Sequence, residues 1–278
     1  MKVANFLVIA NKRCGTSWLN ANLSEHPEIF MTKHKGVHFF DKDVEKGIDH
    51  YSSFFADATN EKMRGETEHS YFWDDDVPQR IYNTLGIIPM ILSLRHPVDR
   101  AYSYFQLIHR KDPTFSGDFK EYFYHEKNNN GKAYAWGKYG EQLQKYLKYF
   151  PLKTFHIINF ENINLDPQQT IKDTYKFLNV DPEFIPSLLN HHWTKATNLP
   201  EHINPVIKKI FYTSKYATFI RRVLRKLSFK QIQLYRSFSP TSLDITLKKA
   251  LTKYYDEDIQ LLTSITNTDF SSWLSSSI

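Results

Sequence analysis

Short apolar runs alternate along the chain with segments whose apolar residues recur at helical spacing. The runs at 3–10, 63–67, 89–94 and 155–160 are typical of buried strands, and shorter extended stretches are expected at 28–31 and 37–40. Helical spacing predicts helices at 17–26, 48–55, 78–85, 98–109, 139–150 and 168–178. Because strands that alternate with helices form parallel sheets, we expect an α/β fold with a central parallel sheet flanked by helices.

The rest of the chain is predicted to complete the same unit. Residues 115–136 are polar and rich in Asn and Gly, which is typical of a surface excursion, here over a cleft. After residue 179 the chain is expected to be mostly helical, and 243–265, with Trp273 beyond it, to close the fold as one helix against the sheet. Since no internal repeat or low-complexity linker divides the sequence, we expect a single domain over 1–278.

The charge of the chain weakly favours an anionic ligand. The formal net charge is +6 and the pI is about 9.1, which are modest values for 278 residues. The basic run at 221–230 suits a solvated helix face better than a nucleic-acid contact, so no nucleic-acid partner is predicted. The same run leaves peripheral contact with anionic lipid open.

Cys14 is the only cysteine, so an internal disulfide and a zinc site with several thiolates are both excluded. The apolar run at 1–10 is too short for a signal peptide or a membrane span, and it leads into a glycine turn as a core strand would. These features predict a soluble, cytoplasmic protein.

The segment 11–19, Asn-Lys-Arg-Cys-Gly-Thr-Ser-Trp-Leu, follows the first predicted strand and opens the first predicted helix. Successive backbone N–H groups at such a turn converge on one point, and the helix dipole adds positive charge, so a phosphate or sulfate fits there. Gly15 permits a close approach of the anion, and Thr16 and Ser17 add hydroxyl donors. Arg13 and Lys12 can supply full positive charge. Taken alone, this turn is equally well a capped helix start.

This segment is not the loop of a nucleoside triphosphatase. That loop needs Gly-Lys followed by Ser or Thr, and an acidic residue elsewhere to hold magnesium. Here no lysine directly precedes Thr16 or Ser17, and the strand at 89–94 ends in Arg95 where such an acid would stand. The site therefore suits an anion whose charge is balanced by protein cations, without a metal, and a small-molecule kinase using ATP and magnesium is disfavoured.

A second anion site follows the strand at 89–94. Arg95 can pair with a phosphate through two parallel hydrogen bonds, and Ser103 offers a hydroxyl from the helix that follows. The alternative for Arg95 is a surface ion pair with an acid such as Asp99. Two anion sites at neighbouring strand ends point to a nucleotide with phosphate at both ends.

Both segments resemble motifs of one family. Residues 13–19 resemble the 5′-phosphosulfate loop of the sulfotransferases, and 95–104 are similar to their 3′-phosphate motif. The similarity extends to Gly65-Glu66-Thr67, to Tyr139 with its helix and to the terminal segment 254–273, and so spans nearly the whole chain. It implies a P-loop-like nucleotide-binding architecture and a metal-independent sulfotransferase that uses 3′-phosphoadenosine 5′-phosphosulfate (PAPS) as its co-substrate.

The resemblance also implies roles for individual residues. Arg13 and the backbone amides from Gly15 to Trp18 would hold the 5′ end of PAPS, and Arg95 with Ser103 would hold the 3′-phosphate. Tyr139 and Lys195 would also face the nucleotide. The nucleotide-contacting set expected from the sequence is Arg13, Cys14, Gly15, Thr16, Ser17, Trp18, Arg95, Ser103, Tyr139 and Lys195.

The general base is the main departure from the family pattern. Residues 35–41 resemble the stretch where many carbohydrate sulfotransferases carry Lys-Glu-x-x-Phe-Phe, the glutamate being their base, but Gly36 stands at that position. Arg13 is suited to stabilising the leaving group and cannot accept a proton. His38 is the first candidate base, because in an extended segment it returns to the same face. Glu66, at the tip of the next strand and with Glu68 and His69 behind it, is the second.

The expected reaction is transfer of a sulfuryl group from PAPS to a hydroxyl or amino group of a saccharide, glycolipid or similar small acceptor. The alternative is a non-catalytic homologue that binds PAPS, or the product 3′-phosphoadenosine 5′-phosphate (PAP), and lost its base with Gly36.

Overall fold

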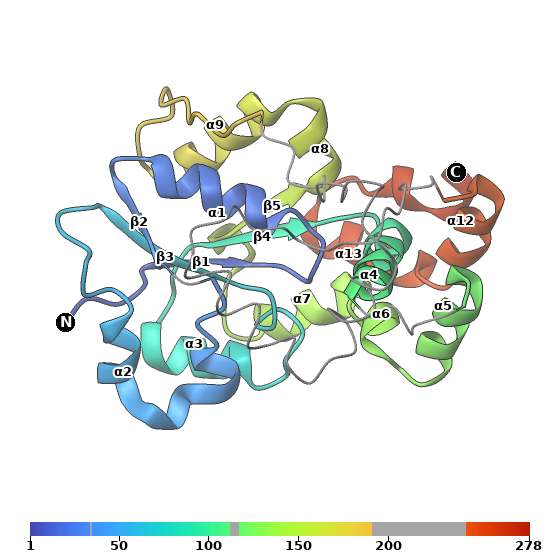
Figure 1. Ribbon diagram of the computed structural model, residues 1–278, viewed down its shortest axis with the longest axis horizontal. Helices are drawn as coiled ribbons and strands as arrows, with labels where there is room; N and C mark the ends of the chain where they lie inside the picture. The colour runs from blue at the N-terminus through green and yellow to red at the C-terminus, as the bar shows by residue number, and fades with distance from the viewer. Residues whose placement is uncertain (34, 112–116, 191–242) are drawn as a thin grey trace, which may run out of the picture.

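A computed structural model gives the structure of residues 1–33, 35–111, 117–190 and 243–278 (Figure 1). These residues form a five-stranded sheet with the order β2-β3-β1-β4-β5, in which every pair of neighbours is parallel. The strands are β1 (Phe6–Ile9), β2 (Ile29–Met31), β3 (Met63–Glu68), β4 (Met90–Leu94) and β5 (Phe155–Asn159). The predicted α/β fold with a central parallel sheet is confirmed.

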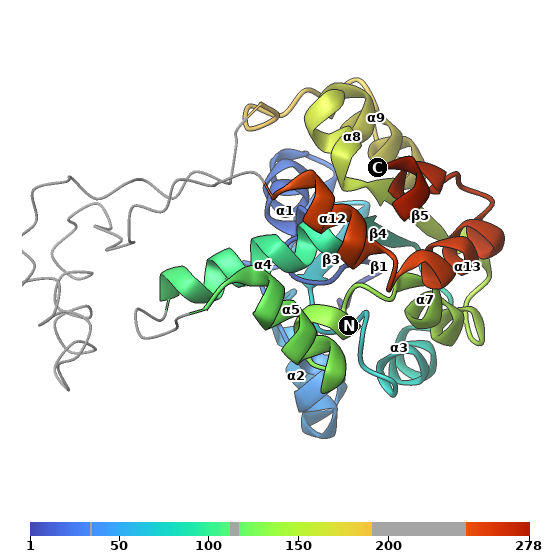
Figure 2. The ribbon, with the colours of Figure 1, turned by 90° about the vertical axis from the view of Figure 1, so that its right-hand side faces the viewer.

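Helices cover both faces of the sheet (Figures 1 and 2). One face carries α1 (Thr16–Glu25), α8 (Phe160–Leu165) and α9 (Pro167–Phe177). The other carries α2 (Gly47–Ser53), α3 (Val77–Leu85), α4 (Pro97–Lys111), α5 (Phe119–Asn128), α6 (Lys132–Ala135), α7 (Tyr139–Leu147), α12 (Ile245–Thr252) and α13 (Asp256–Thr266). None of the helices within the described ranges is long and apolar enough to cross a bilayer.

Strand β1 shows why this sequence forms a two-sided core. Its four residues are all buried, and they alternate between the faces, with Phe6 and Val8 on the α1 side and Leu7 and Ile9 on the other. Such a continuously apolar strand is stable only with helices on both faces. β1 pairs with β3 on one side and β4 on the other, so the connections diverge there. Open α/β sheets bind ligands at this kind of switch point, beyond the carboxyl ends of the strands.

The prediction of a surface excursion at 115–136 is wrong for the part that the structure describes. Residues 117–136 hold α5 and α6, and Phe119 and Phe123 are buried one helical turn apart. Asp118 caps α5 by accepting a hydrogen bond from the backbone N–H of Glu121 (2.8 Å). The Asn-rich stretch that suggested an excursion is only the turn between the two helices.

Two further expectations need correction, and both concern backbone direction. Residues 37–40 are not extended, because His38 has φ +58° and is followed by a single π-helical turn, η1 (Phe39–Asp43). The closing helix is broken into α12 and α13. Residues 179–190 form turns, and the remaining stretch expected to be helical, 191–242 with its basic run, lies outside the described residues.

Candidate functional site

The turn after β1 brings backbone N–H groups together at the start of α1. Arg13 and Gly15 have φ of +78° and +83°, in the left-handed region that favours glycine. A Cβ at Gly15 would lie 2.8 Å from the Phe160 ring, so only glycine fits. Since the first N–H groups of a helix have no partner within it, those of Gly15, Thr16 and Ser17 are available to an anion.

The two predicted anion motifs meet in space. Arg13 Nε donates a hydrogen bond to Ser103 Oγ (2.9 Å), which places a cation of the first motif on a hydroxyl of the second. An Arg95 guanidinium nitrogen donates to the backbone carbonyl of Arg13 (3.3 Å), and its guanidinium carbon lies 4.6 Å from the centre of the Phe160 ring. We call the turn at 12–17 together with Arg95 and Ser103 the phosphate cradle.

Lys35 adds a cation to this cradle, and its role there was not predicted from the sequence. Its Nζ donates to Thr16 Oγ1 (3.0 Å) and Ser17 Oγ (3.1 Å). The signal that could have revealed it is its place in the resemblance, where it matches the lysine of Lys-Glu-x-x-Phe-Phe.

Cys14 and Tyr139 support the cradle from the core. The thiol of Cys14 lies 3.8 Å from the Tyr139 hydroxyl, and complete burial raises the pKa of this thiol. The Tyr139 hydroxyl donates to the backbone carbonyl of Arg95 (2.8 Å). The ring of Tyr139 is buried and fixes the end of β4, and its expected contact with the nucleotide stays a prediction.

Trp18 makes hydrogen bonds within the protein. Its backbone N–H donates to the carbonyl of Gly15 (3.0 Å), and its indole N–H donates to the carbonyl of Leu189 (2.9 Å). Its expected contact with the nucleotide stays a prediction. Lys195 lies outside the described residues.

Glu66 is a residue of the core. It lies within β3 rather than at its tip, is fully buried, and accepts a hydrogen bond from the Tyr51 hydroxyl (2.6 Å). Burial raises its pKa to about 8. Placed beneath Tyr51 and Tyr71, it cannot meet an acceptor that arrives from solvent. The residue that does end β3 is Glu68.

His38 lies in a group of polar side chains at the end of β3. Its Nδ1 is 3.0 Å from Asp41 Oδ2 and 3.5 Å from Glu68 Oε2. His69 Nδ1 is 3.0 Å from Glu68 Oε1, and the Ser70 hydroxyl lies 2.8 Å from both carboxylates. We call these five residues the histidine–carboxylate cluster. In the ranges that the structure describes, no three His, Cys, Asp or Glu side chains are grouped so as to hold a metal ion.

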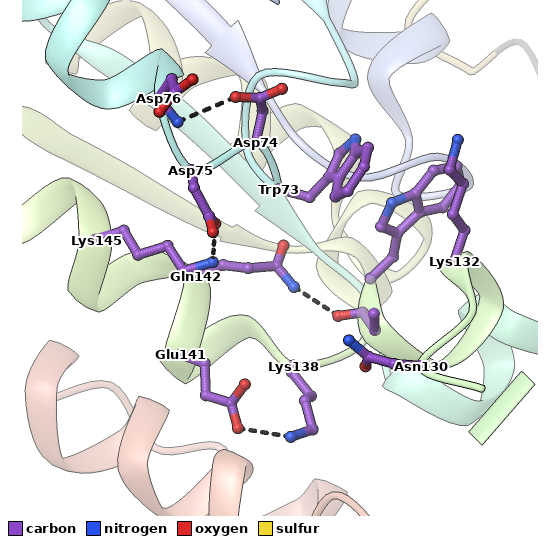
Figure 3. Close-up of a pocket in the computed structure, with 12 residues that line it drawn as sticks. Trp73, Asp74, Asp75, Asp76, Asn130, Lys132, Lys138, Glu141, Gln142 and Lys145 are labelled. Carbon is purple, nitrogen blue, oxygen red and sulfur yellow. Dashed lines mark hydrogen bonds and ion pairs between the residues drawn. The ribbon is translucent and has the colours of Figure 1, made fainter. Parts of the chain in front are cut away.

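A pocket of about 420 Å³ opens beside these elements (Figure 3). The rings of Trp73 and Trp136 lie 6.2 Å apart in its wall. The other lining residues are polar or charged apart from one alanine, namely Asp74, Asp75, Asp76, Asn130, Lys132, Ala135, Lys138, Glu141, Gln142 and Lys145. Several of the charges are paired, as in Lys138–Glu141 (2.6 Å) and Lys145–Asp75.

The pocket is tied to the turn after β1. The Asn11 side-chain amide donates to the carbonyl of Trp136 and to Gln142 Oε1 (both 2.7 Å), and Lys12 Nζ lies 5.6 Å from the centre of the Trp136 ring. No role was predicted for Asn11, Trp136 or Gln142. The Trp-Asp-Asp-Asp run at 73–76 was the signal available, but only the fold brings Trp136 to it.

Comparison with known proteins agrees with this geometry. Heparan sulfate glucosamine 3-O-sulfotransferase 5 of Mus musculus is 30% identical over 189 residues, which cover 63% of this chain and 53% of that protein. Bifunctional heparan sulfate N-deacetylase/N-sulfotransferase 3 of the same organism is 28% identical over 203 residues, covering 66% of this chain and 23% of that protein. The chain thus spans about half the length of the first relative and a quarter of the second.

The fold is shared with a solved structure as well. The crystal structure of a sulfotransferase from Alicyclobacillus acidocaldarius matches with a TM-score of 0.71 and 23% identity, over 98% of this chain and 99% of that chain. Residues 4–222 match the family model described as "Sulfotransferase domain". Together with the phosphate cradle at the switch point of the sheet, this match shows that the chain belongs to the sulfotransferase family.

Proposed function

We propose that the protein transfers a sulfuryl group from PAPS to a hydroxyl or amino group of a saccharide acceptor. The observation that carries the proposal is the contact between the two anion motifs, in which Arg13 donates to Ser103 while Arg95 bonds the backbone of Arg13. A ligand with phosphate at both ends of one nucleoside suits this arrangement. Membership of the sulfotransferase family supports the same donor.

In this proposal each part of the cradle has a task. Arg95 and Ser103 hold the 3′-phosphate, and the amides of residues 15–17 hold the 5′-phosphosulfate. Arg13 and Lys35 stabilise the negative charge that develops on the bridging phosphate oxygen as the sulfur–oxygen bond breaks. The acceptor oxygen or nitrogen attacks sulfur in line with that bond.

The acceptor class rests on the relatives and on the tryptophan-lined pocket. The names of the two relatives describe 3-O- and N-sulfotransferases of heparan sulfate, which supports a saccharide whose hydroxyl or amino group is modified. Indole rings such as Trp73 and Trp136 can pack against the apolar face of a sugar, while the surrounding polar groups bond its hydroxyls. We therefore place the acceptor in this pocket (Figure 3).

Calorimetry followed by a transfer assay tests the proposal. The purified protein should bind PAP, and labelled PAPS should give a sulfated product from members of a saccharide panel, identified by mass spectrometry. Absence of PAP binding would refute the proposal. Binding of PAP without transfer to any acceptor would favour the non-catalytic alternative suggested by Gly36. Stabilisation by ATP with magnesium, but not by PAP, would favour a kinase. The cytoplasmic location expected from the sequence stays a prediction.

A further inference from the structure

Gly36, in the loop before η1, lies against Glu68 at the end of β3. The N–H of Gly36 donates to the carbonyl of Thr67 (3.2 Å), which aligns the loop with the end of β3. A Cβ built at Gly36 would lie 3.3 Å from Glu68 Oε2 and 3.5 Å from His38 Nε2. The carboxylate of Glu68 thus lies beside the position where the resembling carbohydrate sulfotransferases carry a glutamate side chain.

Glu68 is a buried carboxylate whose two oxygens differ in their hydrogen bonds. Its Oε1 accepts from the Ser70 N–H (3.0 Å) and lies near His69 Nδ1 and the Ser70 hydroxyl. Its Oε2 is buried and has no hydrogen-bond partner among the described residues. Burial alone would raise the pKa of Glu68, but the bonds from His69 and Ser70 outweigh it and lower the pKa to about 2. The group that faces this free oxygen is the ring of His38, 3.5 Å away.

These carboxylates define which nitrogen of His38 carries a proton. Nδ1 faces Asp41 Oδ1 at 3.2 Å and Oδ2 at 3.0 Å, in addition to Glu68. A ring nitrogen between two carboxylates is the donor, so in the neutral ring Nε2 is the acceptor. The side chain of His38 is 30% exposed, so its ring is open in part to solvent.

Charged groups surround this ring from three segments. Asp41 and Asp43 lie on η1. Glu68 and His69 lie at the end of β3, and Lys35 lies in the loop before η1. Lys35 bonds Thr16 and Ser17 of the phosphate cradle and is followed directly by Gly36. The ring of His38 is therefore next to the segment that reaches the sulfuryl end of the cradle.

We propose that Glu68 replaces the carboxylate absent at Gly36, acting as a positioning residue for His38, which accepts the proton of the acceptor. The inference rests on the proposed function. As the acceptor oxygen or nitrogen bonds to sulfur, its proton passes to Nε2 of His38, and the bond from sulfur to the bridging oxygen breaks with its electron pair leaving on the 5′-phosphate of PAP. Asp41 and Glu68 stabilise the imidazolium, which then loses its proton to solvent.

The transfer assay with Glu68→Gln tests this role. The variant should lose about tenfold or more in kcat/KM while its affinity for PAP stays within about twofold of the parent. The pH dependence of kcat/KM should also change, because Glu68→Gln removes a negative charge that faces the imidazole of His38. His38→Gln should lose about 100-fold in kcat/KM and should lose that pH dependence. Glu45→Gln, the same change at an exposed residue of η2 (Val44–Lys46), is the matched control and should match the parent.

A second readout does not depend on turnover. Ring ¹⁵N and ¹³C shifts of His38 should show the proton on Nδ1 in the parent, and the proportion of this tautomer should fall in Glu68→Gln but not in Glu45→Gln. An unchanged tautomer in Glu68→Gln would overturn the inference, as would an unchanged pH profile in an active enzyme. If the parent binds no PAP, the proposed function fails, while the ring shifts still decide whether Glu68 acts on His38.

Discussion

The phosphate cradle and the histidine–carboxylate cluster are built in different ways, although they flank the same loop. The cradle depends on backbone, since the left-handed turn at Gly15 aims amides at a point and the carbonyls of Arg13 and Cys14 hold neighbouring side chains in place. The cluster depends on side chains that come from η1 and from the end of β3. A backbone site tolerates few substitutions at its turn, whereas a cluster of side chains can exchange one carboxylate for another.

The largest effect that distinguishes the two regions should come from Arg95→Ala. Loss of this guanidinium should weaken PAP binding by about 2 to 4 kcal/mol, because a charge-assisted pair with phosphate is lost in a partly desolvated site. The ring ¹⁵N and ¹³C shifts of His38 should not change. Calorimetry with PAP measures the first effect. Arg64→Ala, at the opposite end of the sheet at the start of β3, is the control and should bind like the parent. Equal affinity of Arg95→Ala and the parent would remove Arg95 from the cradle.

Sequence reasoning succeeded where local backbone chemistry defines the structure. The strand, glycine turn and helix at 3–26, and the Arg95 turn after the strand at 89–94, follow from apolar runs and from residues with restricted backbone preferences. Both turns lie where they were expected. The match to the sulfotransferase family model, over residues 4–222, includes both motifs.

The failures concern long-range packing and single backbone angles. His38 was placed on an extended segment, but its positive φ turns the chain into η1 and brings Asp41 to its ring. Glu66 was placed at the tip of a strand that continues for two more residues, so the residue that ends the strand is Glu68. Trp136 joins Trp73 only through the packing of α6, which no local pattern reveals. None of these features can be read from composition or periodicity.

The two glutamates of β3 belong to different regions, Glu66 to the core and Glu68 to the histidine–carboxylate cluster. The pKa of Glu66 in the folded protein is about 8, above its ordinary value of 4.5, so the folded state binds a proton that the unfolded state releases. Stability from this group is present at low pH and is lost as the pH rises towards 8. Between pH 5.5 and 7.5 the loss is about 1.4 kcal/mol per unit, or about 2 to 3 kcal/mol in all.

Glu66→Gln should abolish that decline, because an amide does not titrate. Urea unfolding at pH 5.5 and 7.5 should show the variant gaining about 2 to 3 kcal/mol on the parent between the two values. Glu45→Gln should show no such gain. Sulfuryl transfer by Glu66→Gln at neutral pH should stay within about twofold of the parent. A loss of about 100-fold, with folding intact, would return Glu66 to the position of candidate base.

The smallest effect should come from Trp73→Leu, which tests whether the acceptor binds in the tryptophan-lined pocket. If a sugar packs on the indole of Trp73, Trp73→Leu should raise KM for a saccharide substrate found in the transfer screen by about fivefold, or about 1 kcal/mol. Affinity for PAP and the pH profile should be unchanged, because the cradle and the cluster do not include Trp73. Tyr82→Leu removes an exposed ring on α3 outside the pocket and is the matched control. A change in PAP affinity with KM unchanged would instead connect the pocket to the cradle through Asn11, which bonds both Trp136 and Gln142. In that case the pocket would stabilise the turn after β1, and the acceptor would bind elsewhere.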